Sequence, residues 1–274
     1  MTKPFENKRI IITGASSGIG KEMAVQLSRQ SARLTLAARS ADKLAEVAHL
    51  CQANGTQAIH VPTDVSQEDQ CRNLIQFSVN QFGGVDILVN NAGYTMWSKF
   101  EDMTQMDIGE KLFKVKFFGS VYCTYAALPF LKASKGQILT ISSMTGKIGV
   151  PTRTYYAAAN HALAGFFDSL RGEVHDDGIN ITVVYPGYIA TPIRQRAINS
   201  AGQSHGKSHI DESSAMPVDI CVRQILEATA NKKRELFLTW KDRLGVWLKM
   251  VSPPLVDYIA RQKTSYDKLT HANK

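Results

Sequence analysis

A serine and a tyrosine in the middle of the chain have the types and the setting needed for proton transfer to a carbonyl oxygen. Ser143 follows the apolar run 137–141, and Tyr156 begins the alanine-rich helical segment that comes next. A hydroxyl at a strand end and a phenol on the following helix can meet over one substrate oxygen. The phenol then acts as general acid or base, while the serine holds the oxygen by a hydrogen bond.

Such a phenol needs a neighbouring positive charge. Tyrosine has an ordinary pKa of about 10, and proton transfer near neutrality requires roughly three units less, or about 4 kcal/mol. One ammonium about 4 Å away supplies about this amount at an effective dielectric constant near 20. Asn160 lies one helical turn after Tyr156 and carries no charge. Its amide is still able to hydrogen-bond a ribose hydroxyl.

A glycine-rich turn near the N-terminus suits phosphate binding. The apolar run 9–13 is followed by Gly14-Ala15-Ser16-Ser17-Gly18-Ile19-Gly20, and a helical pattern begins at once. A strand, a glycine turn and a helix place backbone N–H groups and the helix dipole against an anion. The spacing is Gly-x-x-x-Gly-x-Gly rather than the commoner Gly-x-Gly-x-x-Gly, and a plain turn is the alternative interpretation.

The residue after the second predicted strand, 34–38, bears on the choice of cofactor. An acidic residue at such a strand end accepts hydrogen bonds from the adenosine ribose, but here Arg39 stands in that place. Its guanidinium offers two parallel N–H donors to a 2′-phosphate, which points to NADP(H) rather than NAD. A solvated arginine at the start of a loop is the alternative.

Strands and helices are predicted to alternate along the chain, which indicates an α/β fold with a doubly wound parallel sheet. Further strands are expected at 59–65, 86–93 with its turn, 137–142 and 180–185, and long helices at 104–132 and 153–175. We interpret 1–230 as a single catalytic domain with a substrate lid at about 192–216. Residues 231–274 form a basic, amphipathic helical extension.

Composition narrows the class of protein. The chain has 274 residues, of which 44% are hydrophobic, and this suits one large globular domain. It contains no apolar run of about 18 residues and no apolar leader at its start, so we expect a cytoplasmic protein. The cysteines are far apart and are predicted to be buried thiols. No metal site is expected from their spacing.

The net charge of +8 is concentrated in the extension. Trp240, Leu244, Trp247, Leu248 and Val251 share one helical face, and basic residues lie among them. A segment of this kind binds anionic membrane surfaces. Packing on the same domain or on a second subunit is the alternative that we favour. Nucleic-acid binding is not expected, because neither a basic-aromatic groove nor a known motif is present.

Together, these features resemble the short-chain dehydrogenase/reductase family. The motifs, in family order over about residues 7–195, are Thr13-Gly14-x-x-x-Gly18-x-Gly20, Asn90-Asn91-Ala92-Gly93, Ser143, Tyr156 and Pro186-Gly187 with Thr191. The tail resembles the branch containing 11β-hydroxysteroid dehydrogenase type 1. The resemblance implies a Rossmann-type fold and hydride transfer between NADP(H) and a ketone or secondary alcohol. It also suggests a homodimer or homotetramer through the two long helices. An apolar steroid-, retinoid- or lipid-like substrate is expected if the extension lies on a membrane surface.

The resemblance assigns roles residue by residue. Ser143 would hold the substrate oxygen, and Tyr156 would be the general acid/base. The residues expected around the cofactor are Gly14, Ser16, Ser17, Gly18, Ile19, Gly20, Arg39, Asp64, Val65, Asn91, Ala92, Gly93, Tyr156, Asn160, Pro186, Gly187, Ile189 and Thr191. Those expected around the substrate, with Ser143, are Tyr94, Thr145 and Tyr188.

Two positions depart from the family pattern. The family has lysine one turn after the tyrosine, where this chain has Asn160, and asparagine in the preceding long helix, where this chain has Lys116. The helical neighbours of Lys116 are apolar or small: Leu112, Phe113, Gly119 and Ser120. We therefore expect its side chain to enter a crevice and bring an ammonium to Tyr156, directly or through water. In the alternative, Lys116 reaches solvent or a subunit interface, and the protein is a catalytically impaired NADPH sensor or scaffold.

Overall fold

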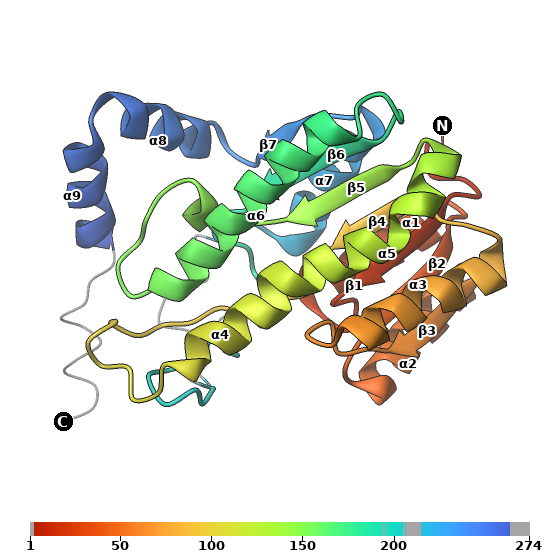
Figure 1. Cartoon of the computed structure of the whole chain (residues 1–274), viewed down its shortest axis with the longest axis horizontal. Coiled ribbons are helices and arrows are strands. Elements are labelled where there is room, and N and C mark those ends of the chain that lie inside the picture. The colour runs from red at the N-terminus through yellow and green to blue at the C-terminus, as the bar shows by residue number, and fades with distance from the viewer. Residues whose placement is uncertain (1–2, 194, 205, 207–214, 264–274) are drawn as a thin grey trace.

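The fold is a single parallel sheet covered by helices, shown by a computed structural model that describes residues 3–193, 195–204, 206 and 215–263 (Figure 1). Within these residues the sheet has 7 strands in the order β3-β2-β1-β4-β5-β6-β7, and all neighbours are parallel. The strands are β1 (Arg9–Thr13), β2 (Arg33–Ala38), β3 (Ala58–Pro62), β4 (Ile87–Asn90), β5 (Gln137–Ile141), β6 (Asn180–Tyr185) and β7 (Glu235–Phe237). The predicted Rossmann-type doubly wound fold is confirmed.

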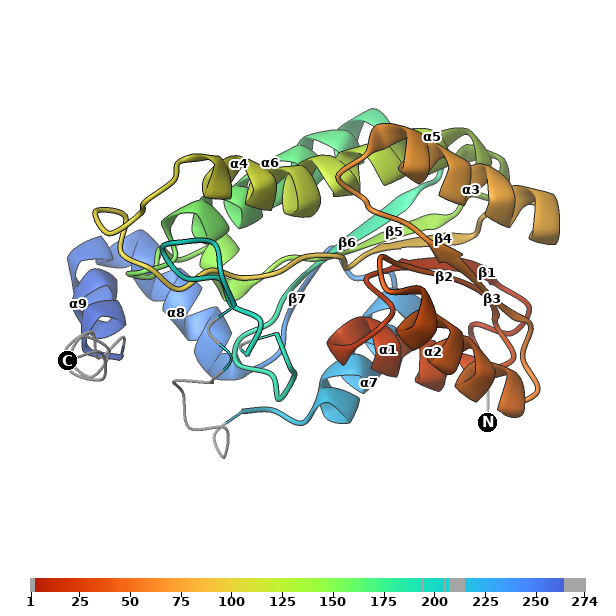
Figure 2. The same ribbon diagram turned by 90° about the horizontal axis from the view of Figure 1, so that it is seen from below.

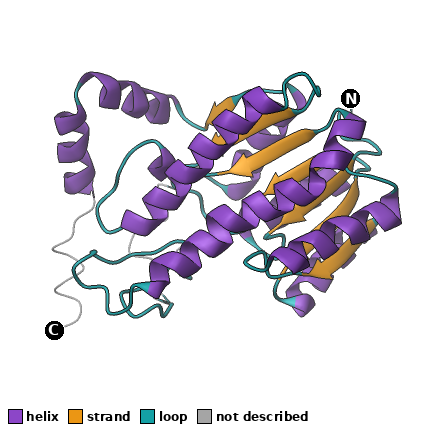
Figure 3. Cartoon of the chain, viewed as in Figure 1, coloured by secondary structure: helices purple, strands orange, loops and turns teal. Residues whose placement is uncertain are grey.

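Helices cover both faces of the sheet, so that the molecule has three layers (Figures 2 and 3). One face carries α1 (Gly18–Ser28), α2 (Ala41–Ala53) and α7 (Val218–Ala230). The other carries α3 (Glu68–Phe82), α5 (Gly119–Ser134) and α6 (Thr154–Glu173), and α4 (Asp107–Phe113) continues the line of α5.

Apolar side chains on both faces of the strands hold the layers together. In β1, Ile10 and Ile12 join the buried cluster beneath α1, α2 and α7, whereas Ile11 joins the cluster beneath α3, α5 and α6. A strand buried on both faces needs apolar residues at successive positions. This is why the central strands read as continuous apolar runs in the sequence.

The strand order reverses direction between β1 and β4, which are neighbours in the sheet. In open parallel sheets, ligands bind outside the carboxyl ends of the strands at such a point. The candidate residues lie at these ends. Gly14 follows β1, Asn91 follows β4 and Ser142 follows β5.

The long helix expected at 104–132 is interrupted. It consists of α4, a π-helical turn labelled η1 (Lys114–Phe118), and α5. A π-turn holds an extra residue per turn and changes the direction of the side chains that it contains. Lys116 is the buried residue of this turn.

The sheet continues beyond the domain boundary expected at residue 230. The short strand β7 pairs with β6, and it was not predicted. The helical extension therefore begins after β7, with α8 (Trp240–Val251) and α9 (Pro253–Lys263), which project from one end of the molecule (Figure 1). The predicted lid at 192–216 lies partly outside the described residues.

The face of α8 predicted to be apolar lies open. None of the described residues of α8 is buried, and Trp240 and Trp247 are 69% and 55% exposed. Of the predicted apolar face, only Leu248 among the described residues of α8 packs toward the domain, where it lines the cavity, and packing of the rest on a second subunit stays a prediction. None of the described helices combines the length and apolar character needed to cross a membrane. The cysteines are buried and unbridged, as predicted.

Candidate active site

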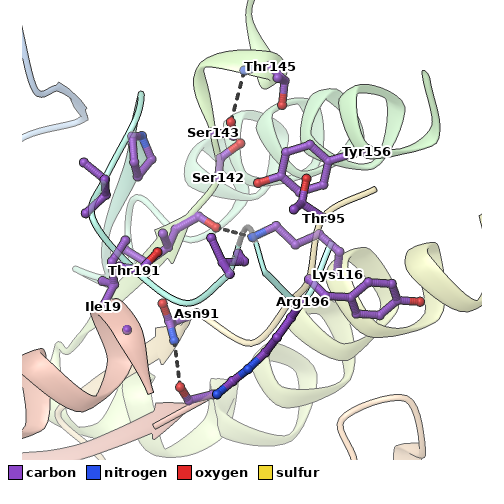
Figure 4. A pocket seen from close by; sticks show the side chains of 18 of the residues that line it. Ile19, Asn91, Thr95, Lys116, Ser142, Ser143, Thr145, Tyr156, Thr191 and Arg196 are labelled. Atoms are coloured by element: carbon purple, nitrogen blue, oxygen red, sulfur yellow. Dashed lines mark hydrogen bonds between the residues drawn. The ribbon is translucent and has the colours of Figure 1, made fainter. Parts of the chain in front are cut away.

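A cavity of about 1480 Å³ lies at the carboxyl ends of the strands. Most predicted site residues line it: Gly14, Ser16, Ser17, Gly18, Ile19, Arg39, Asp64, Val65, Asn91, Ala92, Gly93, Tyr94, Lys116, Ser143, Thr145, Tyr156, Pro186, Gly187, Tyr188, Ile189 and Thr191. Gly20 and Asn160 are not among its lining residues. Figure 4 shows side chains of the wall from close by.

The glycine turn leaves room that side chains would fill. Gly14 has a φ of +67°, and a Cβ there would lie 2.8 Å from Cα of Ala92. A Cβ on Gly20 would collide with the carbonyl oxygen of Gly14, so Gly20 permits helix α1 to pack closely against the turn. Asn91 fixes the same turn, because its amide donates to the carbonyl oxygens of Thr13 (2.9 Å) and Gly14 (3.2 Å).

The first turn of α1 suits a pyrophosphate. Ser17 precedes the helix without capping it through its side chain, and the first turn contains no acidic residue. The backbone N–H groups of this turn are therefore available to an anion, with the helix dipole behind them. Ser16, Ser17 and Gly18 all line the cavity at this point.

The end of the cavity beyond β2 carries two exposed cations. Arg39 lines the wall as predicted, and Lys43 on the first turn of α2 lies beside it and was not predicted. Tyr94 belongs to this end. Burial raises the pKa of the Tyr94 phenol to about 12, while the charge of Arg39 lowers it and that of Asp64 raises it. Tyr94 thus lies near the predicted nucleotide residues rather than only beside the substrate.

Ser143 and Tyr156 come from different elements and face one space. Ser143 caps the 3₁₀ turn η2 (Met144–Gly146), where its Oγ accepts a hydrogen bond from N–H of Thr145 at 3.2 Å. Its own proton therefore remains available for donation. Tyr156 lies in the first turn of α6 and is 7% exposed. Figure 4 shows its hydroxyl directed toward the serine pair.

Lys116 is held inside the cavity wall. Its side chain is 5% exposed, and Nζ donates to the carbonyl oxygen of Ile141 at 2.6 Å (Figure 4). The stem passes over Gly93, where a Cβ would lie 2.8 Å from Cδ of Lys116. Burial lowers the pKa of Lys116 to about 8, so most of its charge is present at neutral pH. The alternative in which this side chain reaches solvent is wrong.

Asn160 has a different setting from the one expected. It is fully buried, its Nδ2 donates to the carbonyl oxygen of Tyr156 at 2.8 Å, and its Oδ1 accepts from Oγ of Ser142 at 3.2 Å. The bond with Ser142 ties α6 to the end of β5. Asn160 therefore lies behind the cavity wall and does not face the space in which a cofactor would bind.

Two arginines on the wall were not predicted. Arg196 donates from Nη1 to Oγ of Ser17 at 2.9 Å, which places a guanidinium beside the start of α1. Arg153 directly precedes α6 and donates from Nη1 to Oγ1 of Thr95 at 2.8 Å. The only available signal for Arg153 was its position just before the helix that carries Tyr156.

The fold and this cavity define a doubly wound α/β protein with a large cavity at the carboxyl edge of its sheet. Residues 8–201 match the family model described as short chain dehydrogenase. The protein "11-beta-hydroxysteroid dehydrogenase-like 2" of Arabidopsis thaliana is 35% identical over 259 residues, which cover 93% of this chain and 82% of that protein. The chain belongs to the short-chain dehydrogenase/reductase family of oxidoreductases.

Solved structures agree with this assignment. An alcohol dehydrogenase from the archaeon Thermococcus sibiricus, complexed with 5-hydroxy-NADP, has a TM-score of 0.70 and 26% identity, and the match covers 83% of this chain and 94% of that one. A family member from Burkholderia phymatum, in complex with NAD, shares the fold with a TM-score of 0.82 at 21% identity, over 93% and 96% of the two chains. These names give no support to the sensor or scaffold interpretation.

Proposed function

We propose that this protein is an NADP(H)-dependent oxidoreductase that interconverts a ketone and a secondary alcohol. The observation that carries the proposal is the placement of Ser143, Tyr156 and Lys116 on one cavity wall at the carboxyl ends of the strands. These side chains supply a hydrogen-bond donor, a proton donor and a buried cation. The adjoining glycine turn and helix start suit a dinucleotide.

In the proposed mechanism each of the three side chains has one task. The nicotinamide ring, when bound, supplies or accepts the hydride. Ser143 donates a hydrogen bond to the substrate oxygen through the proton that its contact with Thr145 leaves available. Tyr156 gives its proton to the same oxygen in reduction and takes it back in oxidation. The ammonium of Lys116 stabilises the tyrosinate formed in between.

Cofactor choice follows from the cations beyond β2. Arg39 and Lys43 line the cavity, and no acidic residue follows β2 directly to accept a ribose 2′-hydroxyl. A phosphate on that ribose would meet two positive charges, one of which can donate two parallel hydrogen bonds. The complex of the archaeal alcohol dehydrogenase with 5-hydroxy-NADP supports this assignment.

The substrate end favours an apolar molecule. Its wall includes aliphatic side chains from the segment that follows η2 and from the helical extension: Ile148, Val150, Leu248, Val256 and Ile259. Aliphatic side chains that line one part of a cavity suit the apolar part of a ligand. The name of the Arabidopsis relative, a hydroxysteroid dehydrogenase-like protein, supports a lipid-like substrate class.

The helical extension is suited to peripheral membrane contact. Trp240, Trp247 and Met250 of α8 are exposed, and so is Tyr258 of α9. Basic side chains flank them, and Nζ of Lys241 lies 5.9 Å from the centroid of the Trp240 ring. Tryptophan beside lysine on an exposed amphipathic helix suits the interface of an anionic bilayer. Because the same extension lines the cavity, a lipid-like substrate would have a short path into the site.

Self-association is proposed through the long helices. On α5, Tyr125 is 77% exposed, and Phe118, one residue before that helix, is 41% exposed. They lie two turns apart on the same face, and Phe118 stacks on Tyr122. Exposed aromatic residues are enriched in protein interfaces. Analytical ultracentrifugation of Tyr125→Glu tests whether a homodimer or homotetramer depends on this face.

Oxidation of NADPH in the presence of a panel of ketones and aldehydes tests the proposed function. Turnover by the wild-type protein that Tyr156→Phe abolishes, with NADPH affinity unchanged, is the expected result. Tight NADPH binding without turnover of any member of an extensive panel would support the sensor or scaffold interpretation instead.

A further inference from the structure

Arg153 places a guanidinium next to the reactive tyrosine. It lines the cavity and is partly buried, and its Cζ lies 6.0 Å from the centroid of the Tyr156 ring. The same carbon lies 4.8 Å from the centroid of the Trp97 ring, and Nη1 donates to Oγ1 of Thr95 at 2.8 Å. Three contacts thus fix the orientation of this side chain.

These contacts leave most donors of Arg153 available. Aromatic rings interact with the face of a guanidinium, whereas its five N–H donors point outward in the plane. Toward the part of the chain that the structure describes, the bond to Thr95 is the only hydrogen bond that uses such a donor. Within residues 3–193, 195–204, 206 and 215–263, no carboxylate forms an ion pair with Arg153.

The backbone at this corner is held in a strained conformation. Thr152 has a φ of +68°, which is rare for a β-branched residue, and its side chain is buried. Its carbonyl oxygen accepts a hydrogen bond from N–H of Ser98 at 3.0 Å. Such strain persists only where surrounding structure imposes it, and it is concentrated at ligand-binding sites. The start of α6 and the 95–98 segment therefore present Arg153 in a fixed position.

The rest of the cavity wall is also positive. Its cationic residues are Arg39, Lys43, Lys111, Lys114, Lys116, Arg153, Arg196 and Lys241, and its acidic residues are Asp64 and Asp242. Asp242 is already engaged, because it accepts hydrogen bonds from N–H and Oγ1 of Thr239. A cavity with this balance attracts anions and leaves Arg153 without a competing carboxylate among the lining residues.

We propose that Arg153 anchors an anionic group of the substrate, a carboxylate or a phosphate monoester, so that the substrate is an amphiphilic carbonyl compound. The inference rests on the proposed function and narrows its substrate class. The guanidinium binds two oxygens of the anion through parallel N–H donors. The carbonyl group then lies at Tyr156 and Ser143, and the apolar part extends along the wall formed with Leu248 and Ile259.

Matched ligands test the anchor by binding and by turnover. The probes are a medium-chain oxo acid and its methyl ester, and a keto phosphate monoester and its dephosphorylated alcohol. Calorimetry on NADPH-saturated protein should give the anion about 10- to 100-fold tighter binding than its neutral partner. The pair with the larger ratio identifies carboxylate or phosphate as the preferred group. In Arg153→Gln the ratio should fall to about one, with the affinity for the neutral ligand unchanged.

Two further variants keep the test decisive. Arg153→Lys retains a charge without the two parallel donors and should keep only part of the preference. Arg72→Gln also removes one positive charge, but from the exposed surface of α3, and should leave the ratio unchanged. If Arg153→Gln fails to fold, the affinity ratio of the anionic and neutral ligands is compared between the wild-type protein and Arg153→Lys.

Three results would be informative in different ways. Equal wild-type affinity for anion and neutral ligand would overturn the anchor. Loss of turnover of both substrates in Arg153→Gln, with a shifted pH profile and an unchanged binding ratio, would overturn it in favour of a direct effect on Tyr156. An anion preference that depends on Arg153, without turnover by the wild-type protein, would support the anchor while contradicting the proposed function.

Discussion

Nζ of Lys116 donates a hydrogen bond to the carbonyl oxygen of Ile141 at 2.6 Å. Ile141 is the last residue of β5 and directly precedes the serine pair, so this bond brings a cation from η1 to the strand end that carries Ser143. The side chain is almost fully buried and lies against Gly93. An ammonium in such a place carries a desolvation cost, and a buried group with a shifted pKa in a cavity is a candidate for a functional role.

Removing this buried charge should stabilise the folded protein near neutral pH. Burial lowers the pKa of Lys116 from 10.5 to about 8, so below pH 8 both folded and unfolded states are protonated and the full cost of burial applies. Between about pH 8 and 10.5 the unfolded state binds more protons, and stability rises with pH. Lys116→Met should therefore raise the free energy of unfolding by about 1–3 kcal/mol at pH 7.

Denaturant unfolding of the apoprotein at several pH values measures this difference. The advantage of Lys116→Met should shrink as the pH rises from 8 to 10.5, because the wild-type lysine loses its proton in that range. Lys114→Met, which removes an exposed lysine of the same turn, is the matched control and should show no such trend. A difference that stays constant with pH would contradict the lowered pKa.

Adding Asn160→Lys to the Lys116→Asn variant should recover part of the activity that Lys116→Asn loses. Lys116→Asn removes the cation, and we expect kcat/KM to fall by about 10²- to 10³-fold. Asn160→Lys alone buries a second ammonium near the first and should destabilise the protein. The double variant has one cation on α6, and because the lysine side chain is longer than that of Asn160 and can extend past the wall, kcat/KM should regain at least tenfold over Lys116→Asn. Activity of Lys116→Asn equal to that of the wild-type protein would show that the cation is dispensable.

The two cations beyond β2 should determine the preference for NADPH over NADH. Arg39→Asp replaces the guanidinium with a ribose acceptor, so kcat/KM for NADPH should fall by about 10²-fold while that for NADH rises. Lys43→Gln should lower kcat/KM for NADPH by a smaller factor, because lysine is a point charge and does not offer two parallel donors. Steady-state kinetics with both cofactors measure the ratio of kcat/KM for NADPH to kcat/KM for NADH. An unchanged ratio in both variants would rule out a 2′-phosphate site here.

Exposed tryptophans of α8 should support binding to anionic vesicles. Trp240→Glu combined with Trp247→Glu removes two interfacial side chains and adds two negative charges, and sedimentation with anionic liposomes should fall at least tenfold. Phe77→Glu changes an exposed aromatic residue on α3 and is the matched control. Equal sedimentation of the wild-type protein, the double variant and Phe77→Glu would contradict the membrane proposal. A second subunit would then be the proposed partner of this face of α8.

Most of the fold could be predicted from the sequence, because a doubly wound sheet leaves strong local signals. Strands buried on both faces appear as apolar runs, and glycine turns mark the points where they meet a cofactor. The strand β7 was missed because it has only 3 residues and follows the charged stretch 232–234. Its pairing with β6 is a tertiary effect that the residues themselves do not indicate.

The site was only partly predictable for a similar reason. The small and apolar neighbours of Lys116 indicated its burial correctly, but nothing in the residue types of 114–118 distinguishes a π-turn from an α-helix. Asn160 was expected to face the cofactor and lies behind the wall instead, whereas Arg153, for which the residues predicted no role, lines the cavity. Asn160 accepts a hydrogen bond from Ser142 at the end of β5. Arg153 donates one to Thr95, and this contact joins segments that are distant in the sequence.

The pH dependence of NADPH-driven carbonyl reduction in wild-type protein and Lys116→Met tests the central claim most directly. One ammonium near a phenolate contributes about 4 kcal/mol, so the variant should lose about 10³-fold in kcat/KM near neutral pH and retain its NADPH affinity. Lys116→Arg should keep part of the rate, because it keeps the charge. A Lys116→Met variant with wild-type turnover and an unshifted pH profile would contradict the account.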